Sequence, residues 1–294
     1  MKLKKKIIVT GGCGFVGTNL ISLLLEKTKF EIISLDNYSS GTKKNHLKNS
    51  RIKYLKGNTV NISQLIKKGN KIEAVFHFGE FARIYQSFTN MNQCIESNSI
   101  GTNAVFNFCL KNKIKLIYSA TSASLGNKGD DKNLSPYAFT KSKNLELLEN
   151  LKKWFNFRYE VIYFYNVYGP HHISKGKMAT VIGIFEDHYK QKKKLPVVRP
   201  GTQTRRFTHI DDTVQICFLA WKKNLCRHYS IANKKSHSLI EVSKMFKSKI
   251  KLLPKRAGER YASALTNMNL SNKIYKHFGK INLKDYIKDF ILKN

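Results

Sequence analysis

The feature that most constrains the fold is a short apolar strand that runs directly into a glycine-rich turn. Residues 6–10 read KIIVT, residues 11–17 read GGCGFVG, and an amphipathic helical pattern follows. Glycines at such a junction permit a tight turn and let backbone N–H groups approach a pyrophosphate at the start of the helix. Asp36 ends the next apolar strand, where an acid accepts hydrogen bonds from an adenosine ribose and repels a 2′-phosphate. The sequence therefore predicts an NAD site and disfavours NADP.

The first half of the chain alternates short apolar strands with amphipathic helices. Strands are expected at 6–10, 31–35, 52–56, 74–78, 116–119 and 161–165, and helices at 17–26, 62–68, 94–111 and 136–153. This alternation predicts an α/β fold, a Rossmann-type doubly wound parallel sheet with helices on both faces. After residues 168–170 (YGP) the regularity fades, which predicts a small C-terminal substrate-binding lobe. We expect an NAD-binding domain of residues 1–166 with 208–235 returning to it, and a lobe of 167–207 and 236–294.

Charge is the least discriminating feature of the sequence, although the formal net charge is +34. Lysines are spread over the whole chain, and no zinc-finger, basic-zipper or RNA-recognition pattern accompanies them. We therefore expect no nucleic-acid partner, but a favourable field for an anionic substrate. The sequence has neither a signal-peptide pattern nor a run of about 20 apolar residues, so no membrane partner is expected. The five cysteines are scattered without a CxxC pair, which indicates no metal site and a reducing, cytoplasmic location.

Tyr137 and Lys141 form the chemically most suggestive pair. Ser135 is expected to cap a helix that Pro136 begins, so the tyrosine and the lysine lie one turn apart on the same helix face. A free tyrosine is a poor base at neutral pH, but a nearby ammonium group and the cationic ring of NAD would stabilise its phenolate. Thr121, at the end of the preceding strand, is placed to bond the same substrate hydroxyl. The pattern predicts proton abstraction coupled to hydride transfer.

With these motifs the chain resembles the extended short-chain dehydrogenase/reductase family, in particular its UDP-glucose 4-epimerase-like nucleotide-sugar epimerases and dehydratases. The resemblance includes TGGCGFVG at 10–17, SPYAFTK at 135–141, FYNVYGP at 164–170 and GTQTRRFTHIDD at 201–212. It implies that Thr121, Tyr137 and Lys141 are catalytic and that the cofactor is NAD. The cofactor-binding residues that it implies are Gly11, Gly14, Phe15, Val16, Gly17, Asp36, Asn37, Asn58, Phe78, Asn98, Tyr137 and Lys141. The substrate-binding residues are Ser87, Asn166, Arg205 and Arg256, the two arginines as partners of the diphosphate.

Several positions depart from the family pattern. Glu80 stands where a small residue is usual, so we expect it either to pair with Arg83 or to reshape the sugar pocket. Asn58 replaces the acid that usually meets the adenine amine. His77 and His209 lie in structural motifs and are interpreted as packed histidines, so no metal ligand is expected.

The residues after Thr121 bear on which reaction is catalysed. They are Ser122 and Ala123, whereas the family's 4,6-dehydratases have an Asp-Glu pair there and its decarboxylases a glutamate. This favours C4 epimerisation of a UDP-sugar through a transient 4-keto intermediate. The segment 169–181 instead resembles ADP-heptose 6-epimerases, in which a lysine matching Lys175 is a second acid/base. In this lysine-rich chain, however, one more solvated lysine in a basic loop is a strong alternative interpretation.

The motifs leave other functions open and also imply an assembly. An ADP- or GDP-heptose-type 6-epimerase, another nucleotide-sugar oxidoreductase or dehydratase, and a catalytically idle NAD-binding regulator are the alternatives. The resemblance also implies a homodimer, formed through the helices near 94–111 and 136–153.

Overall fold

The computed structural model describes residues 5–66, 71–125, 133–258 and 274–294. Within these residues an eight-stranded sheet has the order β14-β11-β6-β5-β4-β1-β2-β3. Its strands are β1 (Lys6–Thr10), β2 (Glu31–Asp36), β3 (Ile52–Lys56), β4 (Ile72–His77), β5 (Lys115–Thr121), β6 (Tyr159–Phe164), β11 (His228–Ala232) and β14 (Ile274–Phe278). Every neighbouring pair is parallel, which confirms the predicted Rossmann-type sheet.

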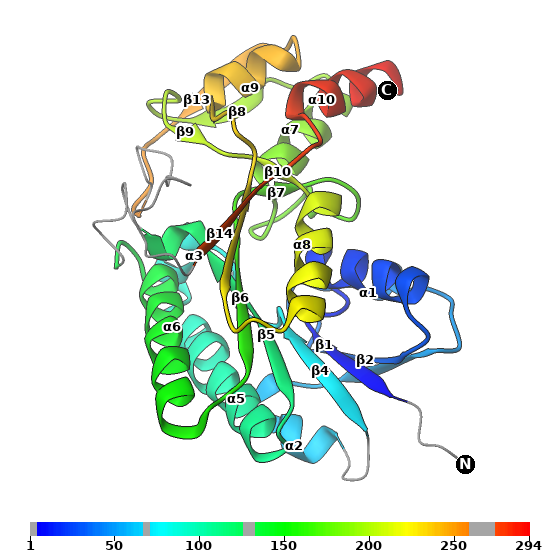
Figure 1. The fold of residues 1–294 in the computed structure, drawn as a ribbon. Coiled ribbons are helices and arrows are strands. Elements are labelled where there is room, and N and C mark those ends of the chain that lie inside the picture. Colours follow the sequence, from blue (N-terminus) through cyan, green and yellow to red (C-terminus); the bar gives the residue numbers. More distant parts are fainter. Residues whose placement is uncertain (1–4, 67–70, 126–132, 259–273) are drawn as a thin grey trace.

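Helices cover both faces of the sheet (Figure 1). The α-helices are α1 (Phe15–Lys27), α2 (Ile62–Leu65), α3 (Ile84–Thr89), α4 (Met91–Ile95), α5 (Thr102–Lys111), α6 (Pro136–Phe155), α7 (Val181–Lys190), α8 (Ile210–Lys223), α9 (Leu239–Met245) and α10 (Leu283–Leu292). Short 3₁₀ turns are η1 (Lys43–Asn45), η2 (Thr59–Asn61) and η4 (Ser122–Leu125), and η3 (Glu96–Gly101) is a π-helical turn. Helices α2, α5 and α6 pack on one face, and α1 and α8 on the other.

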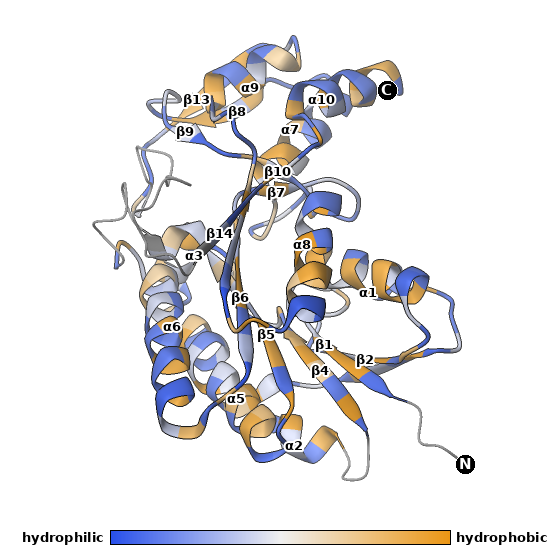
Figure 2. Ribbon diagram, in the orientation of Figure 1, coloured by the Kyte–Doolittle hydropathy of each residue, from blue (hydrophilic) through white to orange (hydrophobic). Residues whose placement is uncertain are grey.

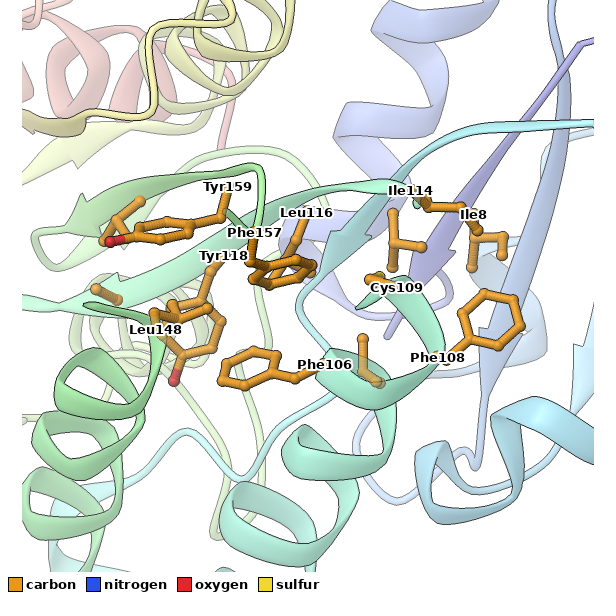
Figure 3. Close-up of a cluster of buried hydrophobic side chains, with 14 of the residues drawn as sticks. Ile8, Phe106, Phe108, Cys109, Ile114, Leu116, Tyr118, Leu148, Phe157 and Tyr159 are labelled. Atoms are coloured by element: carbon orange, nitrogen blue, oxygen red, sulfur yellow. The ribbon is translucent and has the colours of Figure 1, made fainter. Parts of the chain in front are cut away.

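Side-chain alternation along the strands explains these two layers. In β1, Ile8 joins one hydrophobic cluster while Ile7 and Val9 join the cluster on the opposite face. Strands buried on both faces consist of nearly continuous apolar residues, as Figure 2 shows for the centre of the sheet. Figure 3 shows the first cluster, in which Phe106 of α5 meets Tyr118 of β5 edge to face with ring centroids 5.6 Å apart.

A third hydrophobic cluster lies away from the sheet, in the upper part of Figure 1. It unites α7, α9 and α10 with short strands. The short strands in this cluster are β7 (Val167–Tyr168), β8 (Leu195–Val198) and β13 (Ile250–Leu253). Other short strands are β9 (Thr204–Arg205), β10 (Thr208–His209) and β12 (His237–Ser238). The cluster includes residues from chain segments on both sides of α8. Strand β14, however, pairs with β11 in the large sheet, although its residues fall in the segment expected to form the lobe.

The strand order creates a crevice in which a ligand can bind. The chain moves outward from β1 to β2 and β3 and then crosses to β4 on the other side of β1. At such a switch point the connections leave in opposite directions, which opens a crevice beyond the carboxyl ends of the strands. The predicted site residues Asp36 and Thr121 end strands at this edge.

Candidate active site

A cleft of about 430 Å³ lies at the carboxyl edge of the sheet and extends toward the lobe. Residues of the glycine loop, Asp36, the end of β5, the start of α6 and three arginines line it. Of the predicted cofactor residues, those lining it are Gly11, Gly14, Phe15, Val16, Gly17, Asp36, Asn37, Asn58, Phe78, Tyr137 and Lys141. These cofactor residues come from five separate stretches of sequence, which the fold brings together in one space.

The glycine loop fits a dinucleotide phosphate for steric reasons. Gly11 has φ +66°, and a Cβ there would lie 2.8 Å from the backbone of Phe78. A Cβ on Gly17 would lie 2.2 Å from the carbonyl oxygen of Gly11, so only glycine lets α1 start this close to the loop. Helix α1 therefore presents its N-terminal end directly at the cleft, where the helix dipole and backbone N–H groups favour an anion.

Asp36 is held rigidly at the same end of the cleft. One carboxylate oxygen accepts from the Cys13 N–H at 2.9 Å and the other from the Tyr38 N–H at 2.7 Å. Its side chain is fixed by backbone donors, so it can present a negative charge to a ribose without rearranging. Asn58 also lines this end, but its amide oxygen accepts from the Val60 N–H at 3.4 Å as the cap of η2. The residues present fit the adenosine part of NAD.

The predicted catalytic residues meet at the middle of the cleft. Thr121 ends β5, and Tyr137 and Lys141 lie in the first turns of α6. The start of α6 is confirmed, because the Ser135 hydroxyl accepts from the Ala138 N–H at 3.1 Å and Pro136 begins the helix. All three predicted catalytic residues line the cleft.

The electrostatics of Tyr137 differ from the expectation. Burial raises the pKa of Tyr137 to about 12, although a hydrogen bond with Thr121 and the positive charge of Arg83 lower it and Glu80 raises it further. The ammonium group of Lys141 is hydrogen-bonded to Glu80 and to the Ser119 carbonyl oxygen. The charge of Lys141 therefore acts on Tyr137 together with the opposing charge of its partner Glu80, and its predicted effect on the pKa of Tyr137 stays a prediction.

Glu80 is the site residue whose partner the sequence did not reveal. It forms a buried ion pair with Lys141, and the two side chains are 2% and 4% exposed. The expected pairing with Arg83 is wrong: Arg83 donates instead to the carbonyl oxygens of Met178 and Ala82. Glu80 and Lys141 are far apart in sequence, and only the approach of β4 to α6 brings them together. The sole signal in the sequence was an acid at a position where a small residue is usual.

Four residues predicted for substrate binding have different positions. Arg205, Arg256 and Asn166 line the lobe side of the cleft. The Arg256 guanidinium lies over the Tyr85 ring, 5.4 Å from its centroid. Ser87 is fully buried; its hydroxyl donates to the Ile84 carbonyl oxygen at 2.6 Å and accepts from the Tyr137 N–H at 3.3 Å. In this structure Ser87 therefore supports the backbone of Tyr137 and does not line the cleft.

Asn98 is likewise placed behind the cleft. It is fully buried in the π-helical turn η3. Its side chain accepts from the Phe81 N–H at 2.7 Å and donates to the Phe81 carbonyl oxygen at 2.9 Å. It fixes the segment that carries Glu80 and Arg83, which is a structural contribution to the site.

The histidines behave as packed residues. His77 is fully buried between two threonine hydroxyls, and burial lowers its pKa to about 4. His209 caps α8 by accepting from the Asp211 N–H at 3.2 Å. Among the described residues no group of three or more His, Cys, Asp or Glu side chains is arranged to hold a metal. In the same part of the chain, none of the helices combines the length and apolar character that a membrane span requires.

Comparison with known proteins gives a consistent picture. Residues 7–232 match the NAD dependent epimerase/dehydratase family. The ADP-L-glycero-D-manno-heptose-6-epimerase of Brachyspira hyodysenteriae is 29% identical over 257 residues, which cover 82% of this chain and 80% of that protein. The dTDP-D-glucose 4,6-dehydratase of Dictyostelium discoideum is 28% identical over 268 residues, 82% of this chain and 61% of that protein. A UDP-N-acetylglucosamine 4-epimerase structure from Methanobrevibacter ruminantium shares the fold, with a TM-score of 0.84, 23% identity and 100% coverage of both chains.

Proposed function

Because the chain belongs to the NAD dependent epimerase/dehydratase family, we propose that it inverts C4 of a nucleotide sugar, a UDP-sugar by preference, through a transient 4-keto intermediate. The observation that carries the proposal is the convergence of Thr121, Tyr137 and Lys141 in one cleft with the glycine loop. NAD, when bound beside Asp36 and the glycine loop, supplies a reversible hydride acceptor, so no external reductant is consumed.

Tyr137 is the proposed acid–base group. It takes the proton of the sugar hydroxyl during oxidation and returns a proton during reduction. Thr121 holds the same oxygen and lowers the pKa of Tyr137 by hydrogen bonding. Burial serves this chemistry in a second way, since water is excluded from the reacting hydroxyl and the electrostatic interactions around it are strengthened.

The lobe side of the cleft is proposed to bind the nucleotide diphosphate. Arg205 and Arg256 line it, and guanidinium groups bind phosphate oxygens in a bidentate manner. Asn166 also lines the cleft, where it can contact the sugar. A diphosphate held by arginines of the lobe leaves the sugar attached to it free to present either face to Tyr137, as epimerisation requires.

The structure bears on the two alternative reactions. Lys175 is 74% exposed, pairs with Asp187 at 3.4 Å and does not line the cleft, so nothing supports it as a second acid/base for a 6-epimerase. For dehydration, the carboxylates among the described cleft-lining residues are Asp36 and Glu80. Asp36 lies at the cofactor end, and the oxygens of Glu80 already accept from Lys141 and three other donors. C4 epimerisation needs neither carboxylate.

The decisive experiment identifies the product. Purified protein is incubated with NAD and UDP-, GDP- or ADP-sugars, and the configurations at C4 and C6 are followed by NMR, with Tyr137→Phe as the control. A C4 epimer supports the proposal. A 4-keto-6-deoxy product would overturn it in favour of dehydration, with Glu80 as the acid to test next. A C6 epimer would indicate the heptose-type reaction, and NAD binding with every sugar unchanged would indicate an idle regulator.

We also propose a homodimer, supported by apolar side chains left exposed on η3 and α6. Ile100 of η3 is 54% exposed and Phe139 of α6 is 43% exposed. Isolated exposed apolar residues are ordinary, but two on adjoining helical segments suit a shared interface. Light scattering at micromolar concentration tests this, and a monomer would contradict it.

A further inference from the structure

Residues 169–180, which connect β7 to α7, form a closed loop that we call the strap. The loop closes where the Thr180 N–H donates to the Ile173 carbonyl oxygen at 2.8 Å. Ile173, Met178 and Thr180 line the cleft. The strap is therefore one wall of the cleft, and it is built from the part of the chain that enters the lobe.

The start of the strap is held to the elements beside the glycine loop. The Asn19 amide of α1 donates to the Pro170 carbonyl oxygen at 2.9 Å. Nδ1 of His171 lies 3.2 Å from the amide oxygen of Asn45 in η1. These contacts attach the strap to the part of the NAD-binding domain that carries α1.

His172 attaches the same end of the strap to the lobe. Its Nδ1 accepts from the Gly169 N–H at 3.3 Å, and its Nε2 lies 2.9 Å from a carboxylate oxygen of Glu186 in α7. The other oxygen of Glu186 accepts from the Tyr286 hydroxyl of α10 at 2.8 Å. The ring of His172 meets that of Phe15 edge to face, with centroids 6.0 Å apart. The start of the strap is thus fixed to the lobe and to α1 together.

Two side chains at the start of α3 hold the far end of the strap. Nε and Nη2 of Arg83 both donate to the Met178 carbonyl oxygen, the first at 3.0 Å. The Gln86 amide donates to the Lys177 carbonyl oxygen at 2.6 Å. We call these two contacts the clasp. Asn98 holds the segment that carries Arg83 from behind, so the clasp has a fixed base.

The two ends of the strap are attached to different helical layers. Helix α1 belongs to the layer that contains α8, whereas α3 packs against the start of α6, where Ile84 contacts the cluster that includes Tyr137 and Ala138. The strap therefore crosses the carboxyl edge of the sheet from one layer to the other. The cleft that it crosses is lined by the glycine loop, Asp36 and the catalytic residues. A dinucleotide bound along this edge would be enclosed by the strap.

We propose that Arg83 and Gln86 are positioning residues that clasp the strap over the cleft, and that opening of the clasp sets how fast NAD enters and leaves. The inference rests on the proposed function, in which one NAD molecule accepts the hydride and returns it. Turnover of that kind does not require the cofactor to leave, so a slow exchange of NAD is compatible with a fast reaction.

A clasp and a direct cofactor contact differ in their kinetic effect. Loosening a clasp raises the fraction of molecules in the open state, so NAD enters and leaves faster by the same factor. The dissociation constant, which is the ratio of the two rate constants, then stays the same. Removing a side chain that binds NAD directly raises the dissociation rate and the dissociation constant, while the association rate changes little.

The experiment measures both rate constants with NADH as the probe. Stopped-flow fluorescence follows NADH binding to protein freed of NAD, and mixing the complex with excess NAD gives the dissociation rate. Arg83→Met should raise both rate constants at least about tenfold, the worth of a charge-assisted hydrogen bond. Gln86→Met removes a neutral hydrogen bond and should raise both by about two- to tenfold. Arg83→Lys, which keeps one ammonium donor, should fall between Arg83→Met and the unmodified protein.

The matched control is another contact of the strap that does not bridge the cleft. Lys175 pairs with Asp187 of α7 at 3.4 Å and is 74% exposed. An exposed pair of this kind contributes little to holding a segment in place. Lys175→Met should therefore leave both rate constants unchanged, and thermal unfolding of every variant shows whether the fold is intact.

Two outcomes would overturn the proposal. A raised dissociation constant with an unchanged association rate would make Arg83 and Gln86 cofactor ligands. Unchanged rate constants in Arg83→Met and Gln86→Met would show that the clasp does not control exchange. Should Arg83→Met fail to fold, Gln86→Met still decides, because it removes a solvent-exposed contact.

The design separates this inference from the proposed function. The measurement contains no sugar, so its result stands even if the protein catalyses a different reaction. Conversely, a C4 epimer formed by a protein whose clasp variants exchange NADH at the normal rates would support the proposed function and overturn the clasp.

Discussion

Two buried Lys–Glu pairs in this protein have the same chemistry and different surroundings. Lys115 and Glu160 lie 3.0 Å apart with side chains 6% and 0% exposed, much like Lys141 and Glu80 at the cleft. The other partners of the first pair are backbone groups: Lys115 donates to the carbonyl oxygens that end α8, and Glu160 accepts two N–H groups of the turn before β11. That pair connects β5, β6 and α8.

The pair at the cleft has mostly side-chain partners, and it lies among residues that line the cleft. An ion pair that bonds to backbone groups holds helices and strands in position. An ion pair that bonds to side chains at a cleft instead positions the residues of a site. The contrast teaches that burial and charge alone do not mark a functional pair. A functional pair is identified instead by the groups that its members contact and by the site that lies beside it.

The largest expected effect tests whether the cleft pair lies beside a reacting group at all. Tyr137→Phe removes the proposed base and keeps the aromatic ring. Turnover should fall by roughly 10²–10⁴-fold, the range typical of general acid–base catalysis, with folding and NAD affinity little changed. Steady-state kinetics on the identified sugar, with thermal unfolding as the control, measure this. Near-normal turnover would leave the two pairs with no functional difference.

Replacing the lysine of each pair should sharpen the contrast between the structural pair and the cleft pair. Lys115→Met leaves Glu160 buried and unpaired, which typically costs about 3–5 kcal/mol, so the midpoint of thermal unfolding should fall by on the order of 10 °C. Activity per folded molecule should be retained. Lys141→Met should also destabilise the protein, but it should in addition impair turnover and weaken NAD binding. Calorimetry and kinetics on both variants test this, and equal loss of turnover would abolish the contrast.

Acid should destabilise the protein through His77, which lies 3.0 Å from the Thr102 hydroxyl that donates to Glu80 of the cleft pair. Its folded pKa is about 4 against an ordinary value of 6.5, because burial disfavours the charged form. Between these values the unfolded chain binds a proton that the folded protein excludes, so the stability from His77 is complete above pH 6.5 and declines as the pH falls toward 4. The loss over this range is about 3 kcal/mol.

Denaturant unfolding at several pH values, compared with His77→Asn, measures this contribution. The variant should show a shallower loss of stability over the same range, whatever its stability at neutral pH. Parallel pH dependences of the two proteins would mean that His77 titrates normally.

The smallest effect concerns a cation that belongs to neither pair. Arg256 contacts the ring of Tyr85, and no salt bridge of Arg256 is found among the described residues, so its charge remains available to a diphosphate. Arg256→Ala should raise the dissociation constant of the nucleotide sugar about ten- to hundredfold, the worth of one charge-assisted hydrogen bond. NAD affinity, measured by the same calorimetry, should not change. Loss of both would indicate a folding defect.

The fold was predictable because its signals are local. The glycine loop, the strand periods and the Ser135-Pro136 helix start each lie within a few residues, and the structure confirms them. The residues at the cofactor end of the cleft could be predicted from the same local signals. Asp36 could be placed from sequence because the end of a parallel strand fixes its position.

The centre of the cleft was less predictable because side-chain partners there come from distant segments. Glu80 pairs with Lys141, not Arg83, and Ser87 and Asn98 turn their polar groups to backbone instead of the cleft. The hydrogen-bond partner of each of these side chains depends on which donors and acceptors remain free once β4, η3 and α6 have packed. The type of a residue and its position in the sequence do not determine which of these partners it will bond.

The edge of the large sheet has a consequence for how the protein reaches this structure. Strand β11 receives its outer neighbour β14 only after the chain has passed through residues 237–253, which belong to the lobe. During synthesis β11 would emerge long before its partner and expose an unpaired parallel edge next to buried Tyr229 and Ile231. Contacts of such large sequence separation slow folding. Shortening the chain before residue 274 should therefore promote aggregation of the nascent protein.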